Sequence, residues 1–482
     1  MMPKIPYLSA LNQMRNLQPS VSVRVMDIEE ACGSVLAEPL YALYSMPPSP
    51  VSAMDGFAVI SSQTDTASAE KPAVLTEFER VNTGNPVAER FDAVVMIEDV
   101  SINANSITVT SPIKKGKNVR KVGEDIQKGR MILPAGLRLR AFDIGALANY
   151  GYTSVPVKHL SAGIIPTGTE LISPGTEPKA GQVVESNSYM AAAYLRQFGV
   201  SALRYPAVED EREPLRAAVA KAVEENDIVL ISAGSSMGSK DFTESIISEL
   251  GTVLFHGVFM KPAKPVMLGV IKGKPVIGLP GFPLAAATVL RVFLRPLLES
   301  WGFAGPKTTV ISARTGSSVE TEDSIDEFRF AAAAFVEGRY AVLPQIRSAS
   351  ALMNSIKSNC CIHIPRGLGT ASAGDSVTVI AEADFAELKS TVLFGGIYAE
   401  GLEPLVQKLT GSGLSVRFGE GTPDELLEGR FCHGVCTTDA YTPCCPAERF
   451  ALGDGSFLFV RKDMKDPYCP VIKGFAGELY DA

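Results

Sequence analysis

The sequence predicts a multidomain protein of α/β and β parts, and three observations support this class. The chain has 482 residues, which is enough for three or four domains. Strand-like and helix-like segments alternate between residues 160 and 306. Turn-rich strand patterns precede this region and follow it. We therefore expect a central, mostly parallel α/β domain, β-rich regions on both sides of it in the sequence, and a short α/β tail.

The central region carries the clearest pattern. Strand-like LSAGIIPTG precedes a helix candidate at 186–199, and strand-like DIVLISAG precedes another at 241–251. Strands that alternate with helices of this length form βαβ units around a parallel sheet. Ligands of such sheets bind beyond the carboxyl ends of the strands. The strand end at Gly234 is therefore a candidate site.

Two further regions follow the central one. Residues 307–385 contain KTTVISAR, FRFAAAAFVEGRYAVLPQ and DSVTVIAE, which predict a small β-barrel or a sandwich. Residues 391–482 begin with a strand–helix–strand pattern and end in a cysteine-rich, less regular part. We expect this tail to be a short α/β segment.

Composition excludes several classes of function. The formal net charge is -8, whereas nucleic-acid binding needs a basic face. The chain has no run of 18 uncharged apolar residues, so we expect no membrane span. Eight cysteines in a long chain without a signal peptide are expected to be free thiols, and four histidines do not predict a His-rich zinc enzyme. We expect a cytoplasmic protein.

The segment ISAGSSMGSKDFT, residues 231–243, is a candidate anion site. Its small residues allow successive backbone N–H groups to converge, and the helix that begins near Asp241 adds the positive end of its dipole. The alternative is an ordinary strand-to-helix turn in which Asp241 caps the helix.

Charged residues near other strand ends are further candidates. In MKPAKPV, prolines stiffen the backbone around Lys261 and Lys264, which predicts either a cationic clamp for an anion or a solvated basic turn. Glu170 follows a strand in PTGTELISPG. Glu170 and Asp241 together could hold Mg²⁺, which takes one or two carboxylates plus phosphate oxygens, or Glu170 is a surface acid.

Three more motifs do not predict a function by themselves. GLPGFPLAA places Pro280 and a glycine at a strand end before a helix. Asp55 precedes a glycine in SPVSAMDGFAV, which predicts a hairpin turn, and Asp125 is a loop acid in VGEDIQKG.

Taken together, these motifs are specific for one protein family. SAMDGFAV, NTGNPV, EDV, VGEDI, PTGTEL, SAGSSMGSKDFT, MKPAKP and GLPGFP occur in this order. In this respect the chain resembles the molybdopterin molybdenumtransferases, which are related to the E domain of gephyrin. The resemblance covers about residues 1–390.

The resemblance implies a dimer of four-domain subunits. The implied boundaries are a discontinuous linker domain (1–22, 41–50 and 123–159), an inserted β domain (23–40 and 51–122), an α/β molybdopterin-binding domain (160–306) and a β-barrel domain (307–390). Residues 391–482 lie outside this core. They faintly resemble part of a binding-protein lobe, and we expect a chain ending near Leu388 to fold and react without them.

The resemblance also implies a reaction. Members insert molybdate into adenylylated molybdopterin with Mg²⁺, release AMP and form molybdenum cofactor; an upstream adenylyltransferase is a possible partner. The alternatives are the same reaction with tungstate, a non-catalytic molybdopterin-binding scaffold, or an oxyanion sensor that uses the tail.

The resemblance also implies site residues, which are assigned motif by motif. The implied catalytic residues are Glu170, Asp241, Asp55 and Asp125, of which Glu170 and Asp241 are also the metal ligands. The implied substrate-binding residues are Gly234, Ser235, Ser236, Gly238, Ser239, Lys261, Lys264, Pro280, Thr83 and Asp210. Asp55, Thr83 and Asp125 are implied to reach the cleft from the partner subunit.

The chain departs from the family pattern at the anion site. Many members have Ser-Gly-Gly-Val-Ser in the loop, Asn where this chain has Phe282, glycine where it has Ala263, and a basic residue where it has Gly257. These changes leave open whether molybdate or tungstate is used. The tail cysteines of CHGVC, with Cys444 and Cys445, fit no zinc pattern, so we favour thiols over a metal site.

Overall fold

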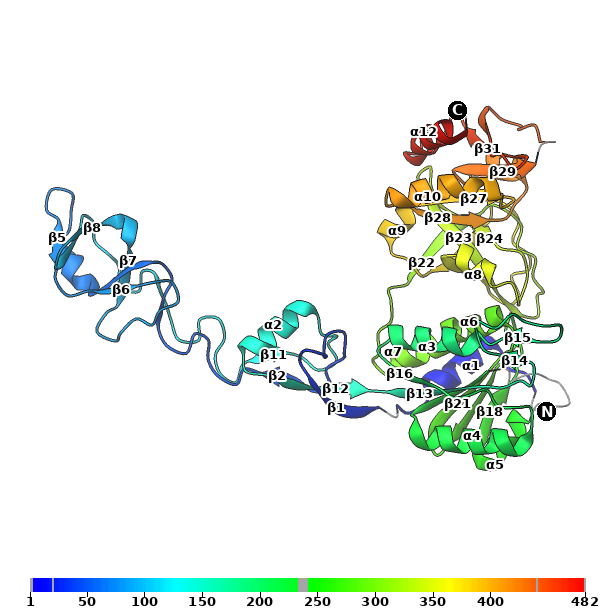
Figure 1. Cartoon of the computed structure of the whole chain (residues 1–482), viewed down its shortest axis with the longest axis horizontal. Helices are drawn as coiled ribbons and strands as arrows, with labels where there is room; N and C mark the ends of the chain where they lie inside the picture. The colour runs from blue at the N-terminus through cyan, green and yellow to red at the C-terminus, as the bar shows by residue number, and fades with distance from the viewer. Residues whose placement is uncertain (1–2, 20, 233–241, 439–440, 481–482) are drawn as a thin grey trace. The chain divides into compact units, whose positions relative to one another are not determined.

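The computed structural model describes residues 3–19, 21–232, 242–438 and 441–480. The chain forms two compact units (Figure 1). One unit consists of residues 22–159, and the other combines residues 1–21 with residues 160–482. Within the described ranges, no helix has the length and apolar character needed to cross a membrane.

The unit of residues 22–159 is mainly β-stranded, as the turn-rich strand patterns predict. Its sheets are β6-β4-β7 and β5-β9-β8, with antiparallel pairs β1–β12, β2–β11 and β3–β10. One core surrounds Phe57 and Ile107, and a second surrounds Leu36 and Leu147. The elements are β1 (Ser22–Asp27), β2 (Leu40–Tyr41), β3 (Val51–Ser52), β4 (Gly56–Val59), β5 (Ala73–Leu75), β6 (Glu79–Val81), β7 (Ala93–Met96), β8 (Val100–Asn103), β9 (Ser106–Val109), β10 (Val119–Arg120), β11 (Met131–Leu133), α2 (Ala141–Asn149) and β12 (Ser154–His159). The domain boundaries implied within this unit stay a prediction.

The α/β domain contains a six-stranded sheet of order β16-β13-β17-β21-β20-β18. The first four strands are parallel, and β20 and β18 form an antiparallel edge. Helices α4 and α5 cover one face, and α1, α3, α6 and α7 cover the other (Figure 1). The strands are β13 (Ser161–Pro166), β16 (Ser201–Arg204), β17 (Ile228–Ser232), β18 (Thr252–His256), β20 (Met267–Ile271) and β21 (Lys274–Leu279). The helices are α1 (Tyr7–Arg15), α3 (Asn187–Gln197), α4 (Arg212–Glu225), α5 (Thr243–Leu250), α6 (Pro283–Val289) and α7 (Arg295–Ser300).

The register of this sheet positions the candidate site. β17 is buried along its whole length because helices cover both faces, which accounts for its continuous apolar run. Pro166 pairs with Ser232, and Ser232 pairs with Leu279. The carboxyl ends of β13, β17 and β21 therefore lie side by side at one edge of the sheet. Two short strands, β14 (Leu171–Ile172) and β15 (Val183–Val184), pair in the segment that follows β13.

The barrel predicted for residues 307–390 is confirmed. Five strands close on themselves in the order β23-β24-β22-β26-β25, and β25 pairs back to β23. A short strand of the α/β domain, β19 (Met260–Lys261), pairs in parallel with the start of β23. The elements are β22 (Thr309–Thr315), β23 (Asp326–Val336), β24 (Arg339–Pro344), α8 (Met353–Lys357), β25 (Cys360–Ile364) and β26 (Ser376–Ala381). The sequence patterns did not identify β25, because its run of five residues has no alternation and follows an irregular polar segment.

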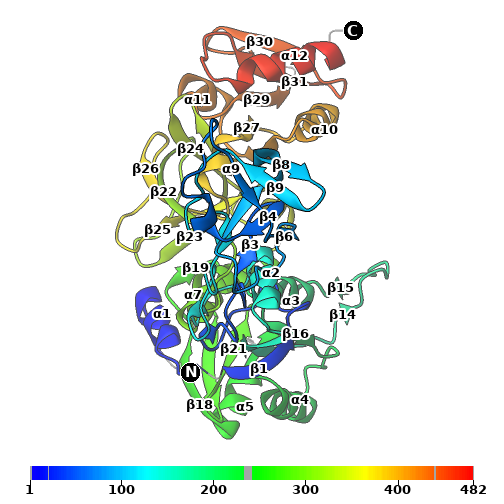
Figure 2. The same cartoon turned by 90° about the vertical axis from the view of Figure 1, so that its left-hand side faces the viewer.

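The tail is an α/β lobe with a five-stranded sheet of order β28-β27-β29-β31-β30 (Figure 2). β28, β27 and β29 are parallel, and β31 and β30 are antiparallel to their neighbours. Its elements are α9 (Phe385–Lys389), β27 (Thr391–Gly396), α10 (Glu403–Gly411), β28 (Ser415–Gly419), α11 (Pro423–Glu428), β29 (Gly434–Thr438), β30 (Ala447–Ala451), β31 (Ser456–Arg461) and α12 (Tyr468–Tyr480).

The tail and the barrel share one hydrophobic core. Ala332, Ala334 and Val336 of β23 and Leu343 of β24 pack with apolar residues of the tail strands and helices. A Cβ placed on Gly419 would lie 2.1 Å from the Cβ of Leu343, so only glycine allows this approach. The carboxylate of Glu337, in the β23–β24 turn, also accepts hydrogen bonds from Arg430 at 2.8 Å and from the Lys465 N–H at 2.7 Å.

This shared core argues against the expectation that the tail is dispensable. A chain ending near Leu388 would expose Val336 and Leu343, and each loses about 1.5–3 kcal/mol of burial free energy when exposed. We predict that this truncated chain aggregates or has a clearly lower melting temperature than the full chain. Size-exclusion chromatography and thermal unfolding measure both.

A matched pair of variants tests the same contact in the full chain. Gly419→Ala should lower the melting temperature, because the added methyl group meets Leu343. Gly411→Ala, at the end of α10, is the control, because no heavy atom lies within 4 Å of its added Cβ. A shared core would be contradicted if the two variants had equal melting temperatures and the truncated and full chains also had equal melting temperatures.

Candidate functional site

The adjacent strand ends of the α/β domain are fixed by backbone hydrogen bonds just beyond the sheet. The N–H and the hydroxyl of Thr167, which follows β13, both donate to the carbonyl of Ser232, each at 3.0 Å. The N–H of Gly168 donates to the carbonyl of Val208 at 3.1 Å. Asp210, an implied substrate-binding residue, follows Val208 by two residues and is exposed. The loops after β13 and β16 therefore lie together.

Glu170 lies on the first of these loops, as predicted. Its carboxylate folds back over Gly168, where an added Cβ would lie 2.9–3.0 Å from the carboxylate atoms. Gly168 has a φ of +145°, which side chains rarely allow. The glycine of PTGTEL therefore gives the exposed Glu170 carboxylate room at the end of the sheet.

The anion nest is predicted for the residues that follow β17. Gly234, Ser235, Ser236, Gly238, Ser239 and Asp241 lie outside the described residues. The next strand end is described: Pro280 follows β21 directly and is buried, and the carbonyl of Gly281 accepts a hydrogen bond of 2.8 Å from the side chain of Asn187. The GLPG turn is thereby tied to the start of α3.

The predicted lysine clamp begins on β19. Lys261 is the last residue of this strand, is half-buried, and forms an ion pair with Glu322. Ala263, where the family has glycine, adopts a φ of +73°. A left-handed conformation costs a non-glycine residue about 1–2 kcal/mol, so this turn keeps the glycine-like backbone in spite of the substitution.

Lys264 has a basic neighbour that the sequence patterns did not identify. Lys4 lies beside it, and the hydrogen bond and charge of Lys264 lower the pKa of Lys4. The Lys4 side chain passes over Gly257, where an added Cβ would lie 3.0 Å from its Cγ. Gly257 is the position at which many family members have a basic residue, and in this fold the basic group beside it comes from Lys4. Two adjacent ammonium groups favour an anion.

A small cavity lies where the α/β domain meets the barrel. Its volume is about 200 Å³. Its lining residues are Lys261, Pro262, Leu284, Glu327, Phe328, Arg329, Phe330, Ile346, Arg347, Ser348, Ala349 and Asn354. We call it the cationic pocket, because three of these side chains are basic and one is acidic.

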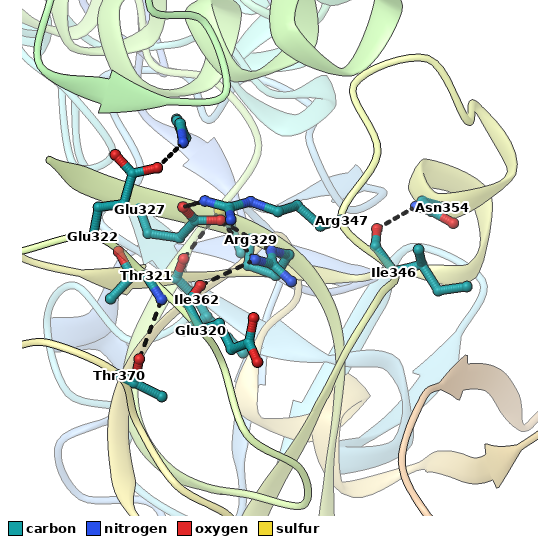
Figure 3. Close-up of polar contacts among 12 residues, drawn as sticks. Glu320, Thr321, Glu322, Glu327, Arg329, Ile346, Arg347, Asn354, Ile362 and Thr370 are labelled. Atoms are coloured by element: carbon teal, nitrogen blue, oxygen red, sulfur yellow. Dashed lines mark hydrogen bonds and ion pairs between the residues drawn. The ribbon is translucent and has the colours of Figure 1, made fainter.

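The arginines of the cationic pocket are held by one buried carboxylate (Figure 3). Glu327 is 1% exposed. It accepts hydrogen bonds from Arg329 at 2.8 Å and 3.1 Å and from Arg347 at 2.9 Å. Arginines that share one carboxylate retain a net positive charge and free N–H donors, so this pocket can bind an anion with several oxygens.

Two known sequence families match this chain. The family described as "MoeA N-terminal region (domain I and II)" matches residues 5–151, and the "Probable molybdopterin binding domain" matches residues 163–300. A molybdopterin biosynthesis protein of Methanocaldococcus jannaschii is 33% identical over 297 residues, which are 58% of this chain and 75% of that protein. The chain belongs to the MoeA family.

Other members of the MoeA family align over more of the chain. The molybdopterin molybdenumtransferase of Haemophilus influenzae is 28% identical over 376 residues, or 73% of this chain and 92% of that enzyme. The crystal structure of the MoeA protein of Pyrococcus horikosii superposes with a TM-score of 0.69 at 30% identity and covers 80% of this chain and all of that chain. Like these relatives, the chain is an enzyme of molybdenum cofactor biosynthesis. A fifth of it lies outside the structural alignment.

The remaining residues implied by the MoeA resemblance lie in the unit of residues 22–159. The Asp55 carboxylate accepts a hydrogen bond of 2.6 Å from the N–H of Thr83, so these two residues lie together. Gly56, which follows Asp55, has no room for a Cβ, because it would lie 1.9 Å from the carbonyl oxygen of Val95. Asp125 instead accepts a hydrogen bond of 2.9 Å from Tyr150 and thereby raises the pKa of that phenol.

The cysteines do not form a metal site among the residues that the structure describes, where no cluster of three or more potential ligands occurs. All eight are free thiols, as predicted. Burial raises the pKa of Cys432 and of Cys469 to about 12, which keeps both thiols protonated and unreactive at neutral pH.

Sequence reasoning missed Arg329, Arg347 and Lys4. Arg329 and Arg347 lie in the barrel region, where no motif was identified, and Lys4 precedes the first helix. The alternation in DEFRF was a usable signal, because Glu327 and Arg329 share one face of a strand whose other face is aromatic.

We predict that Glu327→Gln destabilises the barrel. The substitution removes the charge that balances Arg329 and Arg347, and loss of one partner of a buried pair costs about 3–5 kcal/mol. Urea unfolding measures this change. Glu320→Gln is the control, because its side chain is exposed and only its backbone carbonyl meets Arg329. Unfolding free energies that are equal in the two variants would show that Glu327 does not hold the arginines.

Proposed function

We propose that the chain inserts molybdate into adenylylated molybdopterin, releases AMP and forms molybdenum cofactor. The observation that carries this proposal is the cationic pocket. Lys261, Arg329 and Arg347 line a cavity of about 200 Å³ where the α/β domain meets the barrel. Drug-sized ligands occupy about 300–1,000 Å³, so this volume suits a tetrahedral oxyanion rather than the whole nucleotide-linked pterin.

The basic residues divide into two groups that suit two anions. Lys261 and the two arginines line the cationic pocket. Lys264, on the turn that follows β19, lies beside Lys4 of the N-terminal segment. In the proposed complex, one group binds the oxyanion and the other binds a phosphate of the substrate. Fixed positive charges at both anions lower their mutual repulsion and bring them together, which is the main requirement for phosphoryl chemistry.

Glu170 fits the role of a magnesium ligand. Mg²⁺ retains most of its water and substrate ligands and takes only one or two protein carboxylates, and the exposed Glu170 carboxylate lies at the end of β13. Asp241, the second proposed ligand, lies outside the described residues. When bound, Mg²⁺ would neutralise charge on the phosphoryl oxygens as the phosphoanhydride breaks.

The proposed enzyme is a homodimer in which Asp55, Thr83 and Asp125 act on the partner subunit. The support is the family resemblance together with the Asp55–Thr83 hydrogen bond, which presents an ordered carboxylate on the inserted unit. Each active site would then need residues from both chains.

The experiment follows AMP release from adenylylated molybdopterin with Mg²⁺ and molybdate. We predict that Glu170→Gln lowers AMP release by about 100-fold or more, because it removes a charge that stabilises the transition state. Glu177→Gln is the control, since Glu177 is an exposed acid of the same segment. Unchanged release in Glu170→Gln would exclude the ligand role, and no release by the unmodified chain would exclude the proposed reaction.

Mixed dimers extend this test. Asp55→Ala alone should be as inactive as Glu170→Gln alone. Mixing the two variants should restore part of the activity, because one of the two sites in each mixed dimer retains both carboxylates. If all mixtures stay inactive while native mass spectrometry shows mixed dimers, each site is built within one chain.

A further inference from the structure

A second and larger cavity lies at the edge of the tail sheet. Its volume is about 960 Å³. The lining residues are Ser317, Ser318, Ile346, Gly396, Ile397, Tyr398, Glu420, Gly421, Thr422, Pro423, Glu425, Cys436, Thr437, Thr438 and Tyr441. We call it the tail cavity. It lies within the unit that contains the α/β domain, the barrel and the tail.

The tail cavity occupies the place where α/β sheets bind ligands. β27, β28 and β29 are parallel, and the segments that follow their carboxyl ends all line the cavity. The chain passes from β27 to β28 on one side and then returns to β29 on the other side of β27. The strand order therefore reverses beside β27, and open α/β sheets hold their ligands in the crevice at such a point.

The barrel supplies the opposite wall of the tail cavity. Ser317 and Ser318 follow β22, and Ile346 follows β24. The Ser317 hydroxyl donates to the carbonyl of Glu420 at 3.0 Å, and the N–H of Glu420 donates to the carbonyl of Pro344 at 2.9 Å. These contacts tie the loop after β28 to the barrel, so the cavity is a built feature of the folded chain.

The chemistry of the lining excludes an oxyanion. No lysine or arginine is among the described residues that line the tail cavity, but Glu420 and Glu425 are. Glu425 accepts a hydrogen bond from the Thr422 hydroxyl at 2.7 Å, and the carboxyl group of Glu420 accepts one from the backbone N–H of Ile346. Burial raises the pKa of the Glu420 carboxyl group, although the Ile346 hydrogen bond and the charges of Lys357 and Arg329 act in the opposite direction. A cationic ligand would relieve this cost.

Aromatic rings complete the tail cavity. Tyr398 and Tyr441 are among its lining residues, and the Tyr441 hydroxyl donates to Asp424 at 2.8 Å. One basic group outside the lining, Lys357, stands 4.7 Å from the centre of the Tyr398 ring, which shows that this ring accepts a cation. Carboxylates beside tyrosine rings are the groups that bind amines, amidines and guanidines.

We propose that the tail cavity is a second ligand site and that it takes a small organic cation with an apolar body. Glu420 accepts hydrogen bonds from the ammonium, amidinium or guanidinium group, and the tyrosine rings contact the rest of the ligand. The site is chemically opposite to the cationic pocket. Ile346 lines both cavities and precedes Arg347, so an occupant of the tail cavity contacts the segment that carries an arginine of the cationic pocket.

The test compares three ligands of equal shape on the full chain: benzamidine, benzamide and benzoate. Saturation-transfer NMR and calorimetry at millimolar concentration measure binding. We predict that benzamidine binds and that benzoate does not. Glu420→Gln should weaken benzamidine binding by about tenfold, the usual effect of one lost charge-assisted hydrogen bond. Ser318→Trp, which places a large side chain at the exposed barrel wall, should also weaken it.

Glu448→Gln is the matched control, because Glu448 lies on β30 at the opposite edge of the same sheet. It should leave binding unchanged. The proposal fails if benzoate or molybdate competes with benzamidine, if Glu420→Gln and Ser318→Trp bind benzamidine as the unmodified chain does, or if benzamidine does not bind. AMP release plays no part in this test, so its outcome is independent of the proposed reaction.

Discussion

The pairing of β19 with β23 is the interaction on which the rest of the site depends. Met260 and Lys261 pair in parallel with Asp326 and Glu327, and this ladder joins the α/β domain to the barrel. The same two-residue register places Lys261 beside the strand that carries Glu327 and Arg329. If this pairing slipped by one residue, Lys261 would no longer lie opposite Glu327.

β23 also connects the cationic pocket to the tail. Its even-numbered residues pack outward: Phe328 joins the core of the α/β domain, and Ala332, Ala334 and Val336 join the core shared with the tail. Its odd-numbered residues Ala331 and Ala333 fill the barrel. The run of four alanines therefore permits the barrel core and the tail core to approach β23 closely from its two faces. One strand therefore positions residues of the cationic pocket at one end and contacts the tail at the other.

Much of the fold could be predicted from the sequence, because strand and helix periods are local. The alternation after residue 160 predicted the parallel sheet, and the position of Glu170 after β13 followed from it. The arginines of the cationic pocket could not be predicted in this way, because Arg347 reaches its place only through barrel closure and the Glu327 contact. Lys4 reaches Lys264 only because Ile5 pairs with Val258 across 253 residues of chain. The core shared by the tail and the barrel could not be predicted for the same reason: no local pattern shows that Leu343 fits against Gly419.

The central claim is that an oxyanion binds between β19 and β23, in contact with Lys261 and the two arginines. Anomalous diffraction from crystals grown with tungstate tests it most directly, because the metal can be located without assumptions about the protein. The account predicts one ordered tungstate within hydrogen-bonding distance of Lys261 and of Arg329 or Arg347. An ordered tungstate found only in the tail cavity, or only at another surface, would contradict it.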